Sequence, residues 1–303
     1  MSNVQLADAR FVFYGSGTAG TGIADQVCDA IAQETGRPKN EAARQIWCLD
    51  KQGLLLKSQS DTLTPAQVPF ARDDSEWNTK QNAPGLLSVV KTVKPHVLIG
   101  TSTKPKAFTE EVIREMGRHV ERPIVFPLSN PTRLHEADPK DINEWTDGRA
   151  LMATGSPFPP VERNGGHYEI GECYPLPQTS EWLGYLLSNT ALTLAECNNS
   201  TCFPGIGLGA VLSRTRLLTD QMLVAAVKAL AARSPALQDA NRPLLPDVDE
   251  ARSVSVDIAK AVIQTAVSEG HAEEDNIPTD DGELEEWIQV QMWNPEYRPL
   301  KKV

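Results

Sequence analysis

The chain of 303 residues carries 29 Lys and Arg against 40 Asp and Glu, which gives a formal net charge of −11. This length accommodates roughly two domains of ordinary size. The acidic balance argues against a nucleic-acid partner, which needs a basic face. No apolar run approaches the ~20 residues that a bilayer span needs, so no membrane partner is expected.

The N-terminal segment and the cysteines bear on the compartment. The first ten residues have neither the apolar core of a signal peptide nor the Arg-rich character of a transit peptide. The five cysteines show no CxxC or Cys/His zinc spacing, and their odd number disfavours a disulfide framework. We therefore expect an intracellular protein of the cytoplasm or mitochondrial matrix, without a targeting segment.

Short apolar runs in the first 160 residues predict parallel strands that are buried on both faces. These runs are Phe11–Tyr14, Ile46–Leu49, Val97–Ile99 and Ile124–Phe126, with a weaker fifth at Arg149–Thr154. Between the first two runs, Ile23, Val27 and Ile31 recur every four residues, and a similar helical stripe spans Thr109–Met116. The alternation predicts an α/β fold, a doubly wound parallel sheet of Rossmann type within residues 1–170.

Helices dominate the chain after this sheet. The predicted helices are Phe203–Leu218, Asp220–Ala232 and Val254–Ser268. Thr219 is an expected N-cap for the second of them. The acidic stretch Ala272–Glu285 is expected to be solvated. Residues 196–303 therefore form the C-terminal helical segment of the predicted fold.

The strongest local signal lies between the first strand and the first helix, in Gly15-Ser16-Gly17-Thr18-Ala19-Gly20. The first glycine lets the chain turn, the second lets a pyrophosphate approach the backbone, and the third lets helix and strand pack closely. The helix N-terminus adds N–H groups and a partial positive charge. These six residues are therefore predicted to bind a dinucleotide, the alternative being a tight structural turn.

An acidic residue at the end of the second strand is expected to hold the adenosine ribose. Asp50, with Lys51 beside it, occupies that place, although it lies 33 residues beyond Gly17 instead of the customary ~20. The charged insert from Gly36 to Arg44 accounts for the surplus. A surface Asp that merely ends a strand is the alternative.

Two further strand ends carry small polar residues where this fold binds ligands. Thr101 and Ser102 follow the third strand, and Ser129 and Asn130 follow the fourth. Pro131 biases Asn130 away from helix, so that its amide can face the crevice, although asparagine is equally a turn former. The scattered histidines pair with no Cys or carboxylate at ligand spacing, so neither a catalytic residue nor a metal site is predicted.

Longer runs surround these motifs: Phe13–Ala24, Ile46–Leu54, Glu121–Thr132, Trp145–Ala150, Gly155–Phe158, and Asn198–Asn199 ahead of Phe203–Gly205. Together they resemble the NAD-binding portion of malic enzymes. The resemblance implies oxidative decarboxylation of (S)-malate to pyruvate and CO2, with hydride passing to NAD or NADP and a divalent Mg or Mn polarising the 2-oxo group. It also implies that the three glycines line the pyrophosphate, that Asp50 faces the ribose, and that Asn130 and Asn199 reach nicotinamide and substrate.

The resemblance places the general-base lysine, the catalytic tyrosine, a substrate-binding arginine and all three metal carboxylates upstream of the phosphate loop. This chain starts fourteen residues before Gly15, so we expect it to lack the metal ligands and to be inactive by itself. In the family, NADP preference goes with a basic residue where this sequence has Gln67, which favours NAD.

Two alternatives stay open. One is a non-catalytic dinucleotide-binding or interaction module, either a homo-oligomer or associated with a full-length relative. In the family, helices beginning near Phe203 pack on the upstream half, so an exposed apolar surface is expected at Ile206, Leu208, Val211 and Leu212. The other is a different Rossmann dehydrogenase, which fits the glycine motif but not the runs around Asn130 and Gly155.

Residues 171–195 break the family pattern. Gly171 to Leu194 are 24 residues rich in Pro, Trp and Tyr, without periodicity, and they predict an irregular insertion. A retained intron is the hypothesis, because three nucleotides for each of the 24 residues make 72, a length that keeps the frame. An ordinary surface-loop insertion is the alternative.

Overall fold

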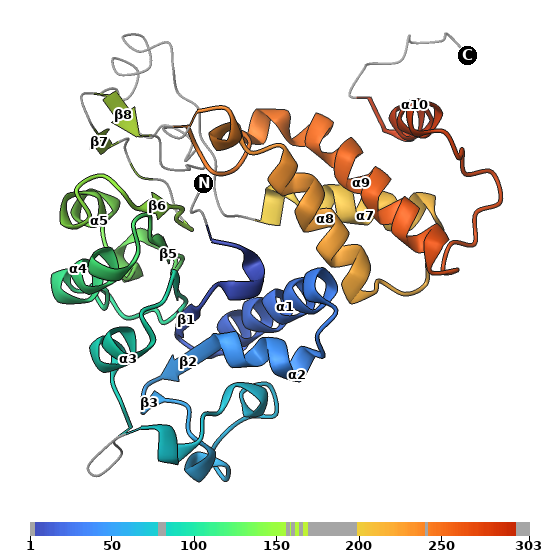
Figure 1. Ribbon diagram of the computed structural model, residues 1–303. Helices are drawn as coiled ribbons and strands as arrows, with labels where there is room; N and C mark the ends of the chain where they lie inside the picture. Colours follow the sequence, from blue (N-terminus) through green and yellow to red (C-terminus); the bar gives the residue numbers. More distant parts are fainter. Residues whose placement is uncertain are drawn as a thin grey trace, which may run out of the picture.

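The computed structural model describes residues 4–77, 83–155, 158, 161–163, 166–168, 199–239 and 242–294. They form an α/β part that contains the main sheet and a C-terminal group of helices stacked beside it (Figure 1). Of the described helices, none combines the length and apolar character needed to cross a membrane.

Six of the described strands form one sheet in the order β3-β2-β1-β4-β5-β6. They are β1 (Phe11–Tyr14), β2 (Ile46–Asp50), β3 (Gly53–Leu54), β4 (Val97–Gly100), β5 (Ile124–Pro127) and β6 (Leu151–Met152). All neighbours pair in parallel except β2 and β3, which are antiparallel. The doubly wound parallel sheet predicted from the sequence is thus confirmed, and its strand order reverses between β1 and β4.

Helices cover both faces of this sheet (Figure 1). They are α1 (Thr18–Thr35) and α2 (Lys39–Ala42) on one side, and α3 (Leu86–Val93), α4 (Glu110–His119) and α5 (Pro139–Trp145) on the other. The loop after β3 contains the 3-10 turns Lys57–Gln59, Val68–Phe70 and Asp74–Glu76.

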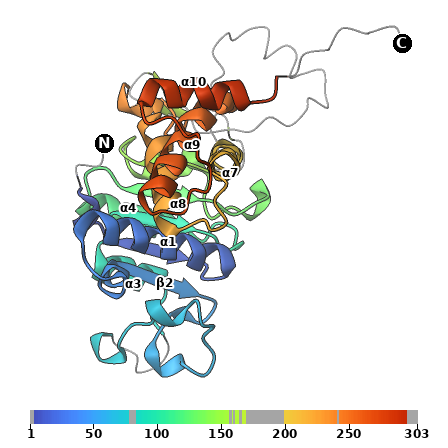
Figure 2. The ribbon, with the colours of Figure 1, turned by 90° about the vertical axis from the view of Figure 1, so that its right-hand side faces the viewer.

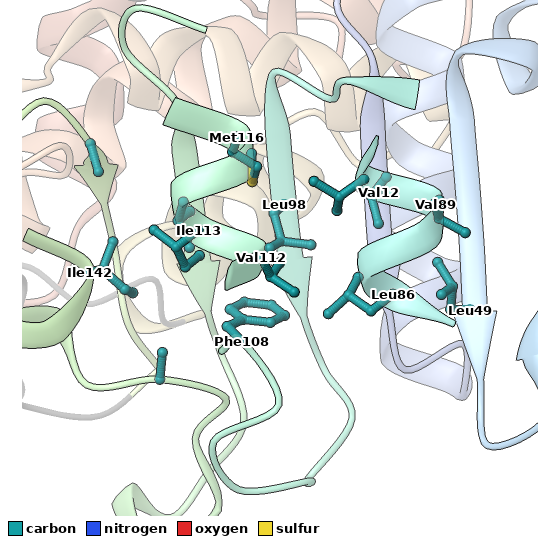
Figure 3. Close-up of a cluster of buried hydrophobic side chains, with 14 of the residues drawn as sticks. Val12, Leu49, Leu86, Val89, Leu98, Phe108, Val112, Ile113, Met116 and Ile142 are labelled. Carbon is teal, nitrogen blue, oxygen red and sulfur yellow. The ribbon is translucent and has the colours of Figure 1, made fainter. Parts of the chain in front are cut away.

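Successive side chains of a strand point to opposite faces, so each strand feeds two cores. Val12 and Leu98 pack with Leu86, Val112 and other residues of α3 and α4, as Figure 3 shows. Their neighbours along the strands, such as Phe13, join the core beneath α1. Burial on both faces explains why the strands read as nearly continuous apolar runs.

The C-terminal helices are α7 (Phe203–Leu212), α8 (Asp220–Ala232), α9 (Ala251–Ser268) and α10 (Asp281–Gln291). Helix α9 contacts the other three, and α8 also rests on α1 (Figures 1 and 2). The Thr219 side chain accepts a hydrogen bond from the N–H of Met222 at 3.2 Å, which confirms the predicted cap of α8. Helix α7 ends earlier than predicted, since Arg214 adopts a left-handed φ of 55°.

Two expectations for this helical part hold for some of their residues and not for others. The acidic stretch Ala272–Glu285 is exposed or half-exposed as predicted, except for Leu284. Leu284 lies in α10, where it is buried against α9 together with Ile288. The apolar side chains of α7 are only partly exposed as a group. Leu208 and Leu212 pack in the same cluster as α10, whereas Val211 is 73% exposed. Apolar residues one helical turn apart find partners that a linear reading does not reveal.

A small antiparallel hairpin of β7 (Val161–Arg163) and β8 (Gly166–Tyr168) follows the main sheet. Residues 171–195 lie outside the described residues. Their irregular character and the division of the chain at this segment therefore stay predictions.

Candidate functional site

The turn between β1 and α1 is built around Gly15. This residue has a φ of 103°, and its N–H donates to the Leu49 carbonyl at 2.9 Å. A Cβ here would lie 2.4 Å from the Thr101 carbonyl carbon and 2.5 Å from the Ser102 backbone. The turn thus requires glycine both for its backbone conformation and for its contact with the end of β4.

The other two glycines of the motif differ in their surroundings. A Cβ on Gly20 would lie 1.9 Å from the Gly15 carbonyl oxygen, so α1 packs directly on the turn. Thr101 Oγ1 donates to that same oxygen at 2.6 Å. A Cβ on Gly17 would meet nothing within 4 Å, and Gly17, Thr18 and Ala19 are exposed. The exposed side of the turn therefore has room for a bound group at the N-terminus of α1, whose first turn contains no acidic residue.

Ser16 points into the protein. Its side chain is 1% exposed, and Oγ donates to the Leu49 carbonyl at 2.9 Å. This bond ties the β1–α1 turn to the end of β2. The hydroxyl is therefore engaged inside the protein rather than presented at the exposed side of the turn.

Asp50 lies at the end of β2, as predicted, and Gln67 holds it. Gln67 Nε2 donates to Asp50 Oδ2 at 3.2 Å and to the Ser16 carbonyl at 2.9 Å. Gln67 Oε1 in turn accepts from the Thr64 N–H at 3.0 Å, and the residue is 6% exposed. Asp50 Oδ1 accepts from the N–H of Lys51 at 2.8 Å, while the Lys51 side chain is exposed. The sequence singled out Gln67 only for its uncharged character, and not for this bridging position.

Asn130 follows β5 at the same edge of the sheet, and its peptide bond to Pro131 is cis. A Cβ on Gly155 would lie 2.4 Å from the Leu128 carbonyl oxygen and 3.0 Å from Asn130 Nδ2. The Asn130 amide therefore lies across Gly155, and the residue is exposed. Thr101 and Asn130 thus stand at the ends of adjacent parallel strands, where ligands of open α/β sheets bind.

Asn199 is placed only by its backbone, at the start of the 3-10 turn Asn199–Thr201 that precedes α7. Its proposed contact with substrate therefore stays a prediction. Within the described ranges, no group of three or more His, Cys, Asp or Glu side chains could hold a metal ion. The described residues therefore do not provide a site that fits the divalent metal of the family.

Two cysteines, Cys28 and Cys48, are buried in the core beneath α1. Burial raises the pKa of the Cys28 and Cys48 thiols to about 12. Both thiols are therefore protonated near neutral pH and are poor nucleophiles.

A family model described as "Malic enzyme, NAD binding domain" matches residues 1–176 and 184–267. The chain belongs to this family. It is 43% identical over 316 residues to the NAD-dependent malic enzyme, mitochondrial, of Saccharomyces cerevisiae, covering 100% of this chain and 43% of that protein.

Two more malic enzymes are also about twice as long as this chain. The NAD-dependent malic enzyme of Schizosaccharomyces pombe is 42% identical over 97% of this chain, which covers 48% of that protein. NAD-dependent malic enzyme 3 of Bacillus subtilis is 41% identical over 100% of this chain, which covers 49% of it. The chain therefore spans about half the length of these malic enzymes.

A solved malic enzyme supports the fold. The crystal structure from Pyrococcus horikoshii Ot3 matches with a TM-score of 0.62 and 21% sequence identity, over 94% of this chain and 53% of that one. The malic enzyme family and the Rossmann-type fold expected from the sequence are thus both confirmed.

Proposed function

We propose that this chain binds the dinucleotide of a malic enzyme, in which malate is oxidised and decarboxylated to pyruvate and CO2 and NAD is reduced. The observation that carries the proposal is the open side of Gly17 at the N-terminus of α1. There a pyrophosphate meets backbone N–H groups and the positive end of the helix. When bound, NAD supplies the hydride acceptor, and the chain's own residues bind and orient it.

The rest of the dinucleotide follows from the strand order. Asp50, fixed by its bond to Gln67 at 3.2 Å, accepts from the adenosine ribose hydroxyls. On the other side of β1, Thr101 and Asn130 lie at the ends of β4 and β5, where the nicotinamide half is expected. The Asn130 amide can donate and accept hydrogen bonds, which suits a carboxamide or a substrate carboxylate.

NAD is the proposed cofactor, with NADP the weaker ligand. The Asp50 carboxylate repels a 2′-phosphate, and Gln67, which touches it, carries no compensating charge. We expect Gln67→Lys to shift the ratio of NADP to NAD affinity upward by about tenfold, since a cation here attracts the phosphate. Isothermal titration with both dinucleotides measures the ratio, and an unchanged ratio would contradict this assignment.

We further propose that the 303-residue polypeptide does not oxidise malate by itself. The resemblance places the base, the arginine and the metal carboxylates in the part of the enzyme that lies upstream of the phosphate loop. The expected result is measurable but weak NAD binding without malate-dependent NADH formation. Malate-dependent NADH formation by the pure chain, abolished by a chelator, would overturn this part of the proposal.

Exposed apolar residues on α7 favour one alternative, a dinucleotide-binding module that associates with a full-length relative. Phe203 is 71% exposed and Val211 is 73% exposed, on a helix whose other side packs on α9. Copurification with a full-length malic enzyme, lost in a Phe203→Ser/Val211→Ser variant that still binds NAD, would support association. A monodisperse monomer that does not copurify with the full-length enzyme would contradict association.

The retained intron remains a prediction about residues 171–194. The family model leaves only residues 177–183 unmatched between its two segments. Sequencing of mature transcripts across codons 165 to 200 tests the hypothesis. Messages that all keep these codons, with genomic borders that lack GT and AG, would make it wrong and favour a surface loop.

We propose the cytoplasm or the mitochondrial matrix as the compartment. The cytoplasm and the mitochondrial matrix both suit a dinucleotide-binding chain of this family, and the yeast relative is named mitochondrial. Localisation of the endogenous protein by fractionation distinguishes the two.

A further inference from the structure

Glu136 is a fully buried carboxylate at the ligand edge of the sheet. It is 0% exposed and follows the 3-10 turn Thr132–Leu134. Its Oε1 accepts hydrogen bonds from the Ser102 N–H at 2.8 Å, Ser102 Oγ at 2.7 Å and Ser129 Oγ at 2.5 Å. Its Oε2 accepts a longer bond from the Ser129 N–H at 3.4 Å. All four donors are neutral, and they come from two different loops.

The two serines adjoin the residues predicted to bind the ligand. Ser102 directly follows Thr101 at the end of β4, and Ser129 directly precedes Asn130 at the end of β5. Thr103 closes the bridge, because its N–H donates to Ser129 Oγ at 2.8 Å. Glu136 therefore fixes the backbone of both loops at one point.

Two other contacts fix Glu136, one at its backbone and one at its carboxyl group. The Phe108 N–H donates to the Glu136 carbonyl at 3.0 Å, and Phe108 is 1% exposed in the core. A Cβ on Gly100 would lie 2.5 Å from Glu136 Cδ, so the carboxyl group lies directly over the last residue of β4. A buried network whose members are all satisfied holds its parts in one arrangement.

We propose that Glu136 is a positioning residue for the nicotinamide half of the dinucleotide. This inference rests on the proposed function. The dinucleotide crosses the sheet where the strand order reverses, between β1 and β4, so its adenine half lies toward β2 and its nicotinamide half toward β5. Among the described residues, the hydrogen bonds of the Glu136 carboxyl group all come from the loops after β4 and β5, on the nicotinamide side. We therefore expect its loss to loosen Thr101 and Asn130 first. Gly17 and Asp50 should be affected less, because their link to Glu136 runs indirectly, through the bond of Thr101 to the Gly15 carbonyl.

The experiment compares NAD with ADP-ribose, which lacks the nicotinamide ring, on the full 303-residue chain. The main variant is Glu136→Gln, which keeps the shape but replaces one acceptor oxygen by an NH2 group opposite the Ser129 N–H. We expect affinity for NAD to fall about tenfold and affinity for ADP-ribose to change by less than about twofold. Saturation-transfer NMR should show a matching loss of signal at the nicotinamide protons relative to adenine H8.

A second variant displaces the carboxyl group of Glu136 without replacing Glu136. Gly100→Ala leaves Glu136 in the sequence but places a methyl group where its carboxyl lies, and it should show the same selective loss. The matched control is Glu115→Gln on α4. Glu115 is 7% exposed and pairs with Arg118 at 2.7 Å, away from the ligand edge. This control should lower stability without changing either affinity.

The outcomes separate the two proposals. A wild-type chain that binds neither ligand overturns the proposed function, and this inference falls with it. A wild-type chain that binds both ligands equally well, or variants that weaken both by the same factor, overturns only the positioning role. Should Glu136→Gln fail to fold, Gly100→Ala decides the matter by the same comparison.

Discussion

Two glycine-rich segments of this protein look alike in sequence and differ in use. The first is the turn Gly15–Gly20, and the second is the stretch Gly205–Gly209 inside α7. In the turn, the buried Gly20 makes room for the carbonyl oxygen of the turn itself. In α7, a Cβ on Gly205 would lie 2.6 Å from the Ile258 Cβ, so the missing side chain makes room for α9.

Each segment also has one glycine that faces open space. A Cβ on Gly17 or on Gly207 would meet nothing within 4 Å. Gly17 precedes the first turn of α1, where backbone N–H groups have no partner inside the helix. Gly207 lies within α7, where the helix uses its own N–H groups. Open space beside a glycine therefore indicates a ligand site only where backbone donors are available.

The largest expected effect comes from Gly20→Ala. The added methyl group would lie 1.9 Å from the Gly15 carbonyl oxygen, so the turn and α1 must separate. We expect a loss of about 3 kcal/mol in the free energy of unfolding, at the upper end for overpacking, together with loss of NAD binding. Urea denaturation measures the free energy of unfolding, and titration with NAD measures binding.

Gly22→Ala is the matched control on the same helix. A Cβ on Gly22 meets nothing within 4 Å, so the substitution should stabilise the protein by about 0.5–1 kcal/mol, because alanine restricts the unfolded chain. Equal effects of the two substitutions would show that contact with the turn is not what requires glycine.

Gly209→Ala tests the helical segment. Its Cβ would lie 2.8 Å from the Val262 Cβ and 2.9 Å from the Ala259 carbonyl oxygen, so α7 must move away from α9. We expect a loss of about 1–3 kcal/mol of stability, with NAD affinity unchanged. The control Gly207→Ala should instead gain about 0.5–1 kcal/mol. A drop in NAD affinity as large as that of Gly20→Ala would erase the distinction between the two segments.

Gly17→Ala combines a small expected effect on stability with a large one on binding. Alanine is a poorer N-cap residue than glycine, so the substitution should cost about 0.5–1 kcal/mol of stability. The cost should stay small because the added methyl group meets no atom within 4 Å. Affinity for NAD should fall by at least about tenfold, because the methyl group takes the space of the pyrophosphate. Retained affinity would place the pyrophosphate elsewhere.

Local patterns in the sequence determined the strands, the glycine turn and α8. The apolar run Phe11–Tyr14 and the stripe of Ile23, Val27 and Ile31 each concern residues within a few positions of one another. Their spacing is the repeat of a strand or a helix, so it can be seen without knowing what they contact. The spacing of the glycines alone fits both a dinucleotide-binding turn and a purely structural turn. The family resemblance favoured the dinucleotide-binding turn.

Tertiary structure alone decided the roles of Gln67, Glu136 and the α7 glycines. Gln67 reaches a carbonyl 51 residues away, and Glu136 binds a serine 34 residues away. No periodicity marks such residues, because their partners meet only when β2 pairs with β1 and β4 pairs with β5. Similarly, α10 begins with acidic residues, yet its Leu284 and Ile288 are buried because they pack against α9. A polar side chain can connect two loops, and a glycine can allow close packing, only when the fold brings a second segment into contact with it.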